Sequence, residues 1–105
     1  MASPITLVQL LLPLSDNDGQ PYPDDLLEGI KQELSRRFGG MTAYERAPAK
    51  GLWRHDGKQS RDNIVVVEVM VEDFDREWWS GLRGCLEAKL GQKALVFRAI
   101  PSVLL

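Results

Sequence analysis

The chain has one cysteine, Cys85, and one histidine, His55, among its 105 residues. A single thiol cannot form a disulfide within the chain, and it cannot supply a zinc site that needs several cysteines. We also expect no metal and no cofactor. The absence of a disulfide fits a reducing compartment, which predicts a cytoplasmic protein.

A surplus of positive charge is also missing, because 13 basic residues face 15 acidic ones and the net charge is −2. Proteins that bind nucleic acid or anionic membranes usually carry a basic surface. No basic-aromatic pattern lies on the first or third predicted strand, as an RNA-binding sheet would need. The composition therefore predicts neither a nucleic-acid partner nor a membrane partner.

Long apolar runs are absent as well. The segment ITLVQLLLPL, residues 5–14, is far shorter than the ~20 residues of a membrane-spanning helix. A signal peptide would have basic residues before such a run and a small-residue cleavage site after it, and neither is present. We interpret the run as a buried strand.

What the chain does contain is one core and a regular succession of strand and helix patterns. Its 44% hydrophobic content suits a single domain spanning residues 1–105. Asp24 or Asp25 and then Asp75 are predicted to cap two helices, which end at Gly39-Gly40 and Gly91. Strands are predicted over residues 5–14, 41–46, 63–72 and 93–100, the last ended by Pro101.

The order β-α-β-β-α-β is typical of a ferredoxin-like α+β sandwich. We expect an antiparallel four-stranded sheet in the order 4-1-3-2, with two helices on one face. Asp56-Gly57 predicts a hairpin turn between the second and third strands.

Alternation along the strands divides their side chains between two faces. The face towards the helices is expected to carry Val8, Leu10, Leu12, Val65, Val67, Val69, Val71, Leu95 and Phe97. The opposite, open face is expected to carry Ile5, Leu7, Gln9, Leu11, Ile64, Val66, Glu68, Met70, Ala94, Val96, Arg98 and Ile100. An open face in water should be polar, yet this one has only three polar residues.

Two interpretations of the open face follow, besides a covering loop or exchanged faces. A second copy of the chain could bury it and form a homodimer, or it could line a pocket for a small apolar ligand. Gln9, Glu68 and Arg98 would then either fix the register of an interface or form a site. In such a site Glu68 would act as a base and Arg98 would hold an anion.

The segment GLWRHDGKQSRDN, residues 51–63, is the other candidate region. We interpret it mainly as an exposed hairpin, because no neighbour is evident that would orient His55 as an acid or base. Contact of Trp53, Arg54 and His55 with a ligand or partner is the alternative. The acidic residues at 16–19 lack the full ligand set of a calcium loop and are expected to make turns.

The second helix predicts three further features. Trp78-Trp79 are expected to belong mainly to the core, and Cys85 to be a buried thiol. Gly81 and Gly84 suggest close packing against the sheet, since glycine weakens a helix.

The segments GLWRHDGK and LGQKAL, with the valine strand and tryptophan-containing helix between them, resemble a family of small bacterial proteins of unknown function. That family shows a G-x-W, a D/G turn and a GQ-x-A join, and the resemblance covers residues 41–98. The matching residues are Gly51, Trp53, Asp56, Gly57, Gly91, Gln92 and Ala94. The family implies no activity and no catalytic residues.

The sequence does not decide whether the protein is an enzyme. The first hypothesis is a non-catalytic interaction or small-ligand-binding module that self-associates through the open face. Its ligand or interface residues would be Leu7, Gln9, Val66, Glu68, Val96, Arg98 and Trp53. The alternative is a small cofactor-free isomerase or monooxygenase with a cleft between sheet and helices. Its candidate catalytic groups are His55, Glu68, Arg98 and Tyr44.

Overall fold

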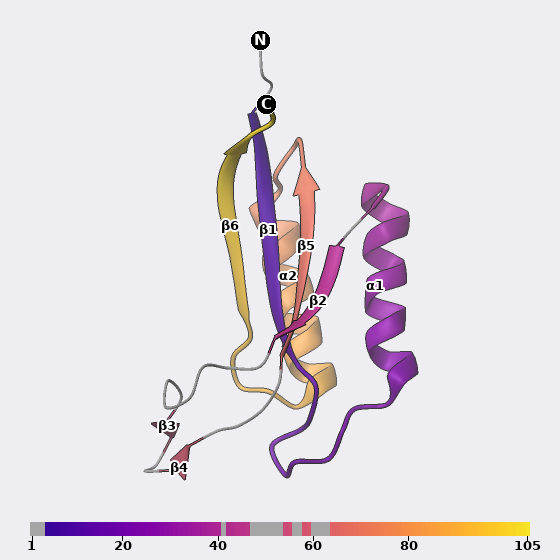
Figure 1. Cartoon of the computed structure of the whole chain (residues 1–105), viewed down its shortest axis with the longest axis vertical. Helices are drawn as coiled ribbons and strands as arrows, with labels where there is room; N and C mark the ends of the chain where they lie inside the picture. Colours follow the sequence, from indigo (N-terminus) through magenta and orange to yellow (C-terminus); the bar gives the residue numbers. More distant parts are fainter. Residues whose placement is uncertain (1–3, 41, 47–53, 56–57, 60–63) are drawn as a thin grey trace.

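The computed structural model describes residues 4–40, 42–46, 54–55, 58–59 and 64–105 (Figure 1). In chain order the elements are β1 (Pro4–Pro13), α1 (Asp24–Phe38), β2 (Thr42–Arg46), β3 (Arg54–His55), β4 (Lys58–Gln59), β5 (Ile64–Val71), α2 (Arg76–Leu90) and β6 (Val96–Val103).

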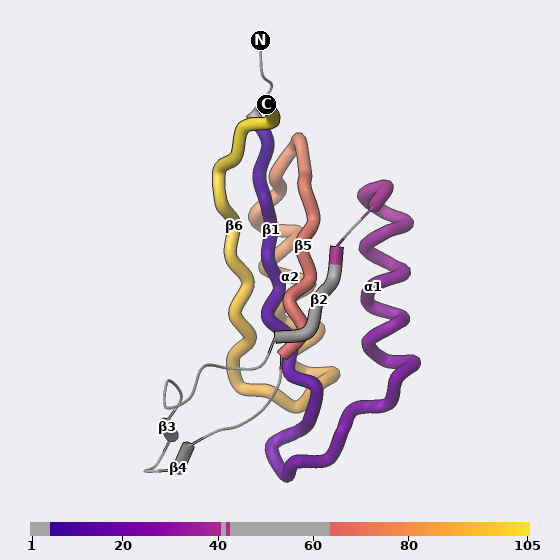
Figure 2. The backbone as a smooth tube through the Cα atoms, viewed as in Figure 1, coloured from indigo at the N-terminus to yellow at the C-terminus, as the bar shows by residue number. Residues whose placement is uncertain are grey.

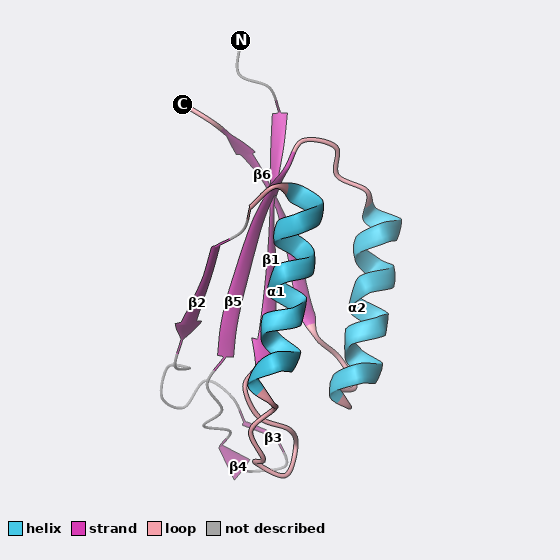
Figure 3. Ribbon diagram, turned by 90° about the vertical axis from the view of Figure 1, so that its right-hand side faces the viewer, coloured by secondary structure: helices cyan, strands magenta, loops and turns pink. Residues whose placement is uncertain are grey.

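The main sheet has four strands in the order β2-β5-β1-β6, and each neighbouring pair is antiparallel. Both helices lie on one face of this sheet, as the side view in Figure 3 shows. The other face, towards the viewer in Figure 1, is covered by no helix of the described residues. The sheet therefore has one helix-covered face and one open face.

The predicted fold class needs correction. We expected a ferredoxin-like sandwich with a single sheet of four strands in the order 4-1-3-2. The described chain is instead a small α+β fold with six strands in two sheets, because β3 and β4 pair only with each other. The sequence between them is the turn dipeptide Asp56-Gly57, which favours local pairing of its flanks. That predicted turn itself lies outside the described residues.

The last strand also differs from its predicted range. β6 spans Val96–Val103 and continues past Pro101, which we had expected to end it. Pro101 stands opposite Thr6 in the pairing of β6 with β1. β6 is an edge strand, and a proline that lacks an N–H group is tolerated there because the outer side of the strand has no ladder bonds to lose.

The core lies between the sheet and the helices, and it confirms the predicted helix-facing set. On the strands, Val8, Leu10, Leu12, Val65, Val67, Val69 and Val71 are buried, as is Leu95 directly before β6, and Phe97 packs against them. From the helices, Ile30, Leu34, Trp79, Leu86 and Leu90 complete the cluster.

Local sequence explains where the helices begin and end. Asp75 caps α2 as predicted, since its side chain accepts a hydrogen bond from the Trp78 backbone N–H at 3.2 Å. At α1, however, Asp24 and Asp25 are not caps; they occupy the first turn after Pro23, where their charge suits the helix dipole. Gly39 ends α1 in the left-handed conformation, with φ of 77°.

An aromatic cluster joins the end of α1 to the start of α2. Phe38 stacks on Trp79 with ring centroids 5.0 Å apart, and Trp78 meets both rings edge-on. Trp79 is buried, whereas Trp78 is half-buried beneath the guanidinium of Arg37, 4.2 Å from its centroid. The two tryptophans thus hold the helices together, as their predicted core role implies.

Two predictions for α2 are wrong. Cys85 is exposed, because it lies about 120° around the helix from the buried Trp79 and so falls outside the sheet-facing stripe. Gly81 and Gly84 do not mark close packing, since a Cβ atom at either position would meet nothing within 4 Å.

Replacing Gly84 by Ala should therefore stabilise the protein. The methyl group enters open space, and alanine is favoured over glycine in a helix by up to ~1 kcal/mol. Thermal unfolding should show a melting temperature a few degrees higher. As a matched control, Gly91→Ala should lower it, because Gly91 has φ of 65°. A melting temperature that falls for Gly84→Ala would contradict the open packing.

Candidate functional site

A row of polar residues crosses the open face of the sheet. Gln9 on β1 stands opposite Glu68 on β5 and opposite Arg98 on β6, while Thr42 on β2 stands opposite Glu68. Residues directly opposite across antiparallel strands share one face. Arg98, Gln9, Glu68 and Thr42 therefore form one line, which we call the polar row.

The centre of the polar row is a side-chain hydrogen bond. The Gln9 Nε2 donates to the Glu68 Oε2 at 2.6 Å, and both side chains are half-buried. A hydrogen bond to a charged carboxylate is stronger than one between neutral groups. This bond fixes both side chains and directs the carboxylate along the middle of the open face.

Apolar residues flank the polar row on both sides. One flank joins Val96, Leu11 and Val66, and the other joins Ile100, Leu7 and Met70. The exposed fractions of Met70, Val96 and Ile100 are 56%, 46% and 40%. Val66 differs from this pattern, since only 2% of it is exposed. The solvent-accessible apolar surface therefore lies towards the β6 side and at the Met70 end of the face.

A hollow of about 310 Å³ opens beside Glu68. Leu7, Thr42 and Met70 line it from the sheet, and Phe38, Gly39 and Gly40 line it from the end of α1. It combines one carboxylate and one hydroxyl with apolar walls. Such a lining suits a small ligand that has a cationic or hydrogen-donating group and an apolar body.

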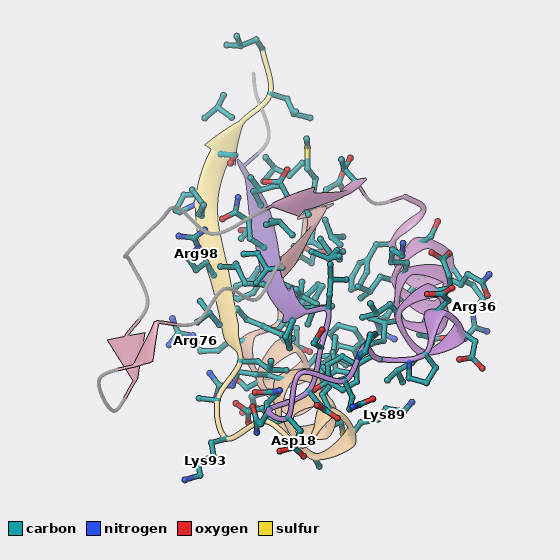
Figure 4. All side chains as sticks on the ribbon, turned by 60° about the horizontal axis from the view of Figure 1, so that its bottom comes forward. Asp18, Arg36, Arg76, Lys89, Lys93 and Arg98 are labelled. Atoms are coloured by element: carbon teal, nitrogen blue, oxygen red, sulfur yellow. The ribbon has the colours of Figure 1, made fainter. Side chains whose placement is uncertain are left out.

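Arg98 stands beside Gln9 on the side opposite Glu68, as the predicted register required. Among the described residues, no hydrogen bond or ion pair joins it to Gln9 or Glu68. It also lines a second hollow at the β6 edge of the sheet, with Arg76 and Arg83 of α2. Figure 4 shows Arg98 and Arg76 on the β6 side of the molecule.

For Tyr44 and His55, the structure describes the backbone within a strand and not the side chain. Tyr44 pairs with Val66 through the backbone of β2, and His55 belongs to the separate β3–β4 sheet. The smooth trace in Figure 2 shows β6, β1 and β5 of the main sheet side by side. Trp53 lies outside the described residues, as do Gly51, Asp56 and Gly57 of the family resemblance.

Another hollow lies between the two helices rather than between helices and sheet. Its volume is about 590 Å³, and its walls include Leu26, Ile30, Trp78, Leu82 and Leu86. None of the four predicted catalytic groups lines it. This hollow is therefore a different place from the sheet–helix cleft expected for a small enzyme.

The acidic loop before α1 makes turns, as we expected. The Asp16 Oδ1 accepts hydrogen bonds from the backbone N–H groups of Asp18 and Gln20, each at 2.9 Å. Within the described part of the chain, no group of three or more metal-ligating side chains comes together. The helices of that part include none with the length and apolarity to cross a membrane.

Sequence reasoning missed how the GQ segment is used. Gln92 Nε2 donates to the Tyr22 hydroxyl at 2.9 Å, and that hydroxyl donates to the Leu90 carbonyl at 2.5 Å. Gly91 supplies the left-handed end of α2 that places Gln92 there. The segment thus fastens the β1–α1 loop to the end of α2. Gly91 and Gln92, two residues of the family resemblance, therefore have a structural role here.

Comparison with known proteins gives one informative match. No family model matches the chain, and no curated protein matches it. Among solved structures, the chain is similar to a phage SAM lyase in complex with S-methyl-5'-thioadenosine. The TM-score is 0.59 at 11% identity, over 99% of this chain and 92% of the lyase. At that identity the likeness shows a shared fold and no more. The resemblance to small bacterial proteins stays a prediction.

Replacing Gln9 by Met should destabilise the protein by removing the amide donor while keeping the side-chain volume. The half-buried Glu68 carboxylate would lose its 2.6 Å partner, at a cost of about 1.5 kcal/mol. Urea unfolding at neutral pH measures this loss. Glu68→Gln is the matched control, because it keeps an acceptor and should cost less. Unchanged stability of Gln9→Met would contradict the role given to the hydrogen bond.

Proposed function

We propose that the protein is a small-ligand-binding module that self-associates through the open face of its sheet. The observation that carries the proposal is the Gln9–Glu68 hydrogen bond set within exposed apolar rows. A polar pair of this kind gives an interface its register, while the apolar rows supply the driving force. The hollow beside Glu68 would lie at the edge of that interface.

The magnitude of apolar burial favours a stable dimer. Burying about 500 Å² of apolar surface per subunit contributes on the order of 12 kcal/mol before the cost of association, at ~25 cal/mol per Å². Met70, Val96 and Ile100 are the most exposed apolar residues of this face. A second copy could cover them by packing sheet against sheet.

Val96→Lys should dissociate the dimer, because it places a charge in the proposed interface. Light scattering coupled to size-exclusion chromatography should show the mass fall towards that of one chain. Val103→Lys is the matched control, since Val103 is an exposed valine of the same strand whose position belongs to the other face of the sheet. A wild-type chain that is monomeric at high concentration would overturn the proposal. Equal dissociation by both variants would also overturn it.

A second candidate function is an enzyme acting on SAM or a related sulfonium compound. The similarity of the fold to a phage SAM lyase favours it. The Glu68 carboxylate, which lines a hollow on the open face, favours it as well. A sulfonium carries a positive charge, which a fixed carboxylate attracts. This candidate directs the enzyme hypothesis towards lyase chemistry and away from isomerase or monooxygenase chemistry. We also propose a cytoplasmic location, because an unpaired thiol and a SAM-type substrate are both compatible with that compartment.

Incubation of the protein with SAM tests this candidate. If it is right, mass spectrometry should detect S-methyl-5'-thioadenosine accumulating with time. Glu68→Gln should lower that rate by tenfold or more while leaving the oligomer mass unchanged. Arg36→Gln, an exposed charge change on α1, should leave the rate unchanged. Absence of product from the wild-type chain would exclude SAM cleavage and leave the binding module.

A further inference from the structure

A second hollow, of about 300 Å³, lies between α2 and the edge strand β6. Arg76 and Arg83 of α2 and Arg98 of β6 line it, together with the Ser80 hydroxyl group. Its lining residues include no aspartate and no glutamate, and Asp75 lies next to it in the sequence as the cap of α2. This hollow is separate from the Gln9–Glu68 pair, and the inference drawn from it does not rest on the proposed function.

The three arginines are available to an external anion. The ion pairs found among the described residues join Lys31 to Glu28 and Arg36 to Glu33, so none involves the arginines of the hollow. Positively charged residues that line one hollow repel one another, and a bound anion lowers that repulsion. Arginine binds phosphate well because its planar fork donates two parallel hydrogen bonds.

Aromatic side chains form the rest of the hollow. Phe74 and Phe97 are half-buried there, and Trp79 is buried behind them. Aromatic side chains and arginine planes are surfaces on which flat rings stack. The hollow thus offers a basic rim for a phosphate and an aromatic floor for a ring.

We propose that this hollow binds a small phosphorylated molecule with a flat ring, of the nucleoside monophosphate class. Arg76, Arg83 and Arg98 would bind the phosphate, and Phe74 and Phe97 would contact the ring. A volume of about 300 Å³ is at the lower end of small-molecule sites, which suits a mononucleotide better than a dinucleotide. The net charge of −2 disfavours a long polyanion as the ligand.

Titration calorimetry of the full chain with adenosine monophosphate at low salt tests the proposal. Saturable one-site binding is expected, with adenosine and inorganic phosphate each binding at least tenfold more weakly. Arg83→Ala should weaken binding about tenfold, and Arg83→Lys should recover only part of it, because lysine lacks the planar fork. Arg83 is exposed on α2, so its removal should not affect folding.

Two controls separate this site from general charge and from the open face. Arg36→Ala changes an exposed arginine on α1, and Glu68→Gln changes the polar row; both should leave the affinity unchanged. No binding of the monophosphate at millimolar concentration would overturn the proposal. Equal weakening by Arg36→Ala would also overturn it, by showing attraction to net charge alone. Phosphate binding as tightly as the monophosphate would overturn the role given to the aromatic floor.

Discussion

The structure depends on one constraint: a sheet whose two faces are both largely apolar is covered by helices on only one of them. On the helix side the valines of β5 and the leucines of β1 close a continuous core with Trp79, Leu86 and Leu34. On the open side, Met70, Val96 and Ile100 remain exposed around the Gln9–Glu68 pair. Exposed apolar area of this kind favours association, which is why the proposed dimer follows from the sheet itself.

Strict alternation made the two faces predictable from the sequence. Val65, Val67, Val69 and Val71 repeat every second residue, so a strand there had to point one apolar set towards the helices. The capping residue Asp75 and the helix-ending Gly39 and Gly91 were equally readable, because each satisfies a local backbone requirement.

What could not be predicted depends on contacts between distant segments or on edge positions. Pro101 reads as a strand end until β6 is known to be an edge strand. Cys85 is apolar enough for the core, yet its angular position on α2 leaves it exposed. The register of Arg98 beside Gln9 was predicted correctly. Its place in the lining of the hollow beside α2 was not, because that depends on how the edge strand packs on the helix. The similarity to a phage lyase concerns the fold alone, so any function has to be argued from the chemistry of these sites.

The most direct test compares the oxidation of two exposed sulfur atoms by hydroxyl-radical footprinting at rising protein concentration. Met70 lies on the open face, whereas Cys85 lies on the helix layer. If a second copy covers the open face, Met70 should become several-fold less reactive as concentration rises, while Cys85 stays constant. Met70 oxidation that is equal at all concentrations would contradict the central claim.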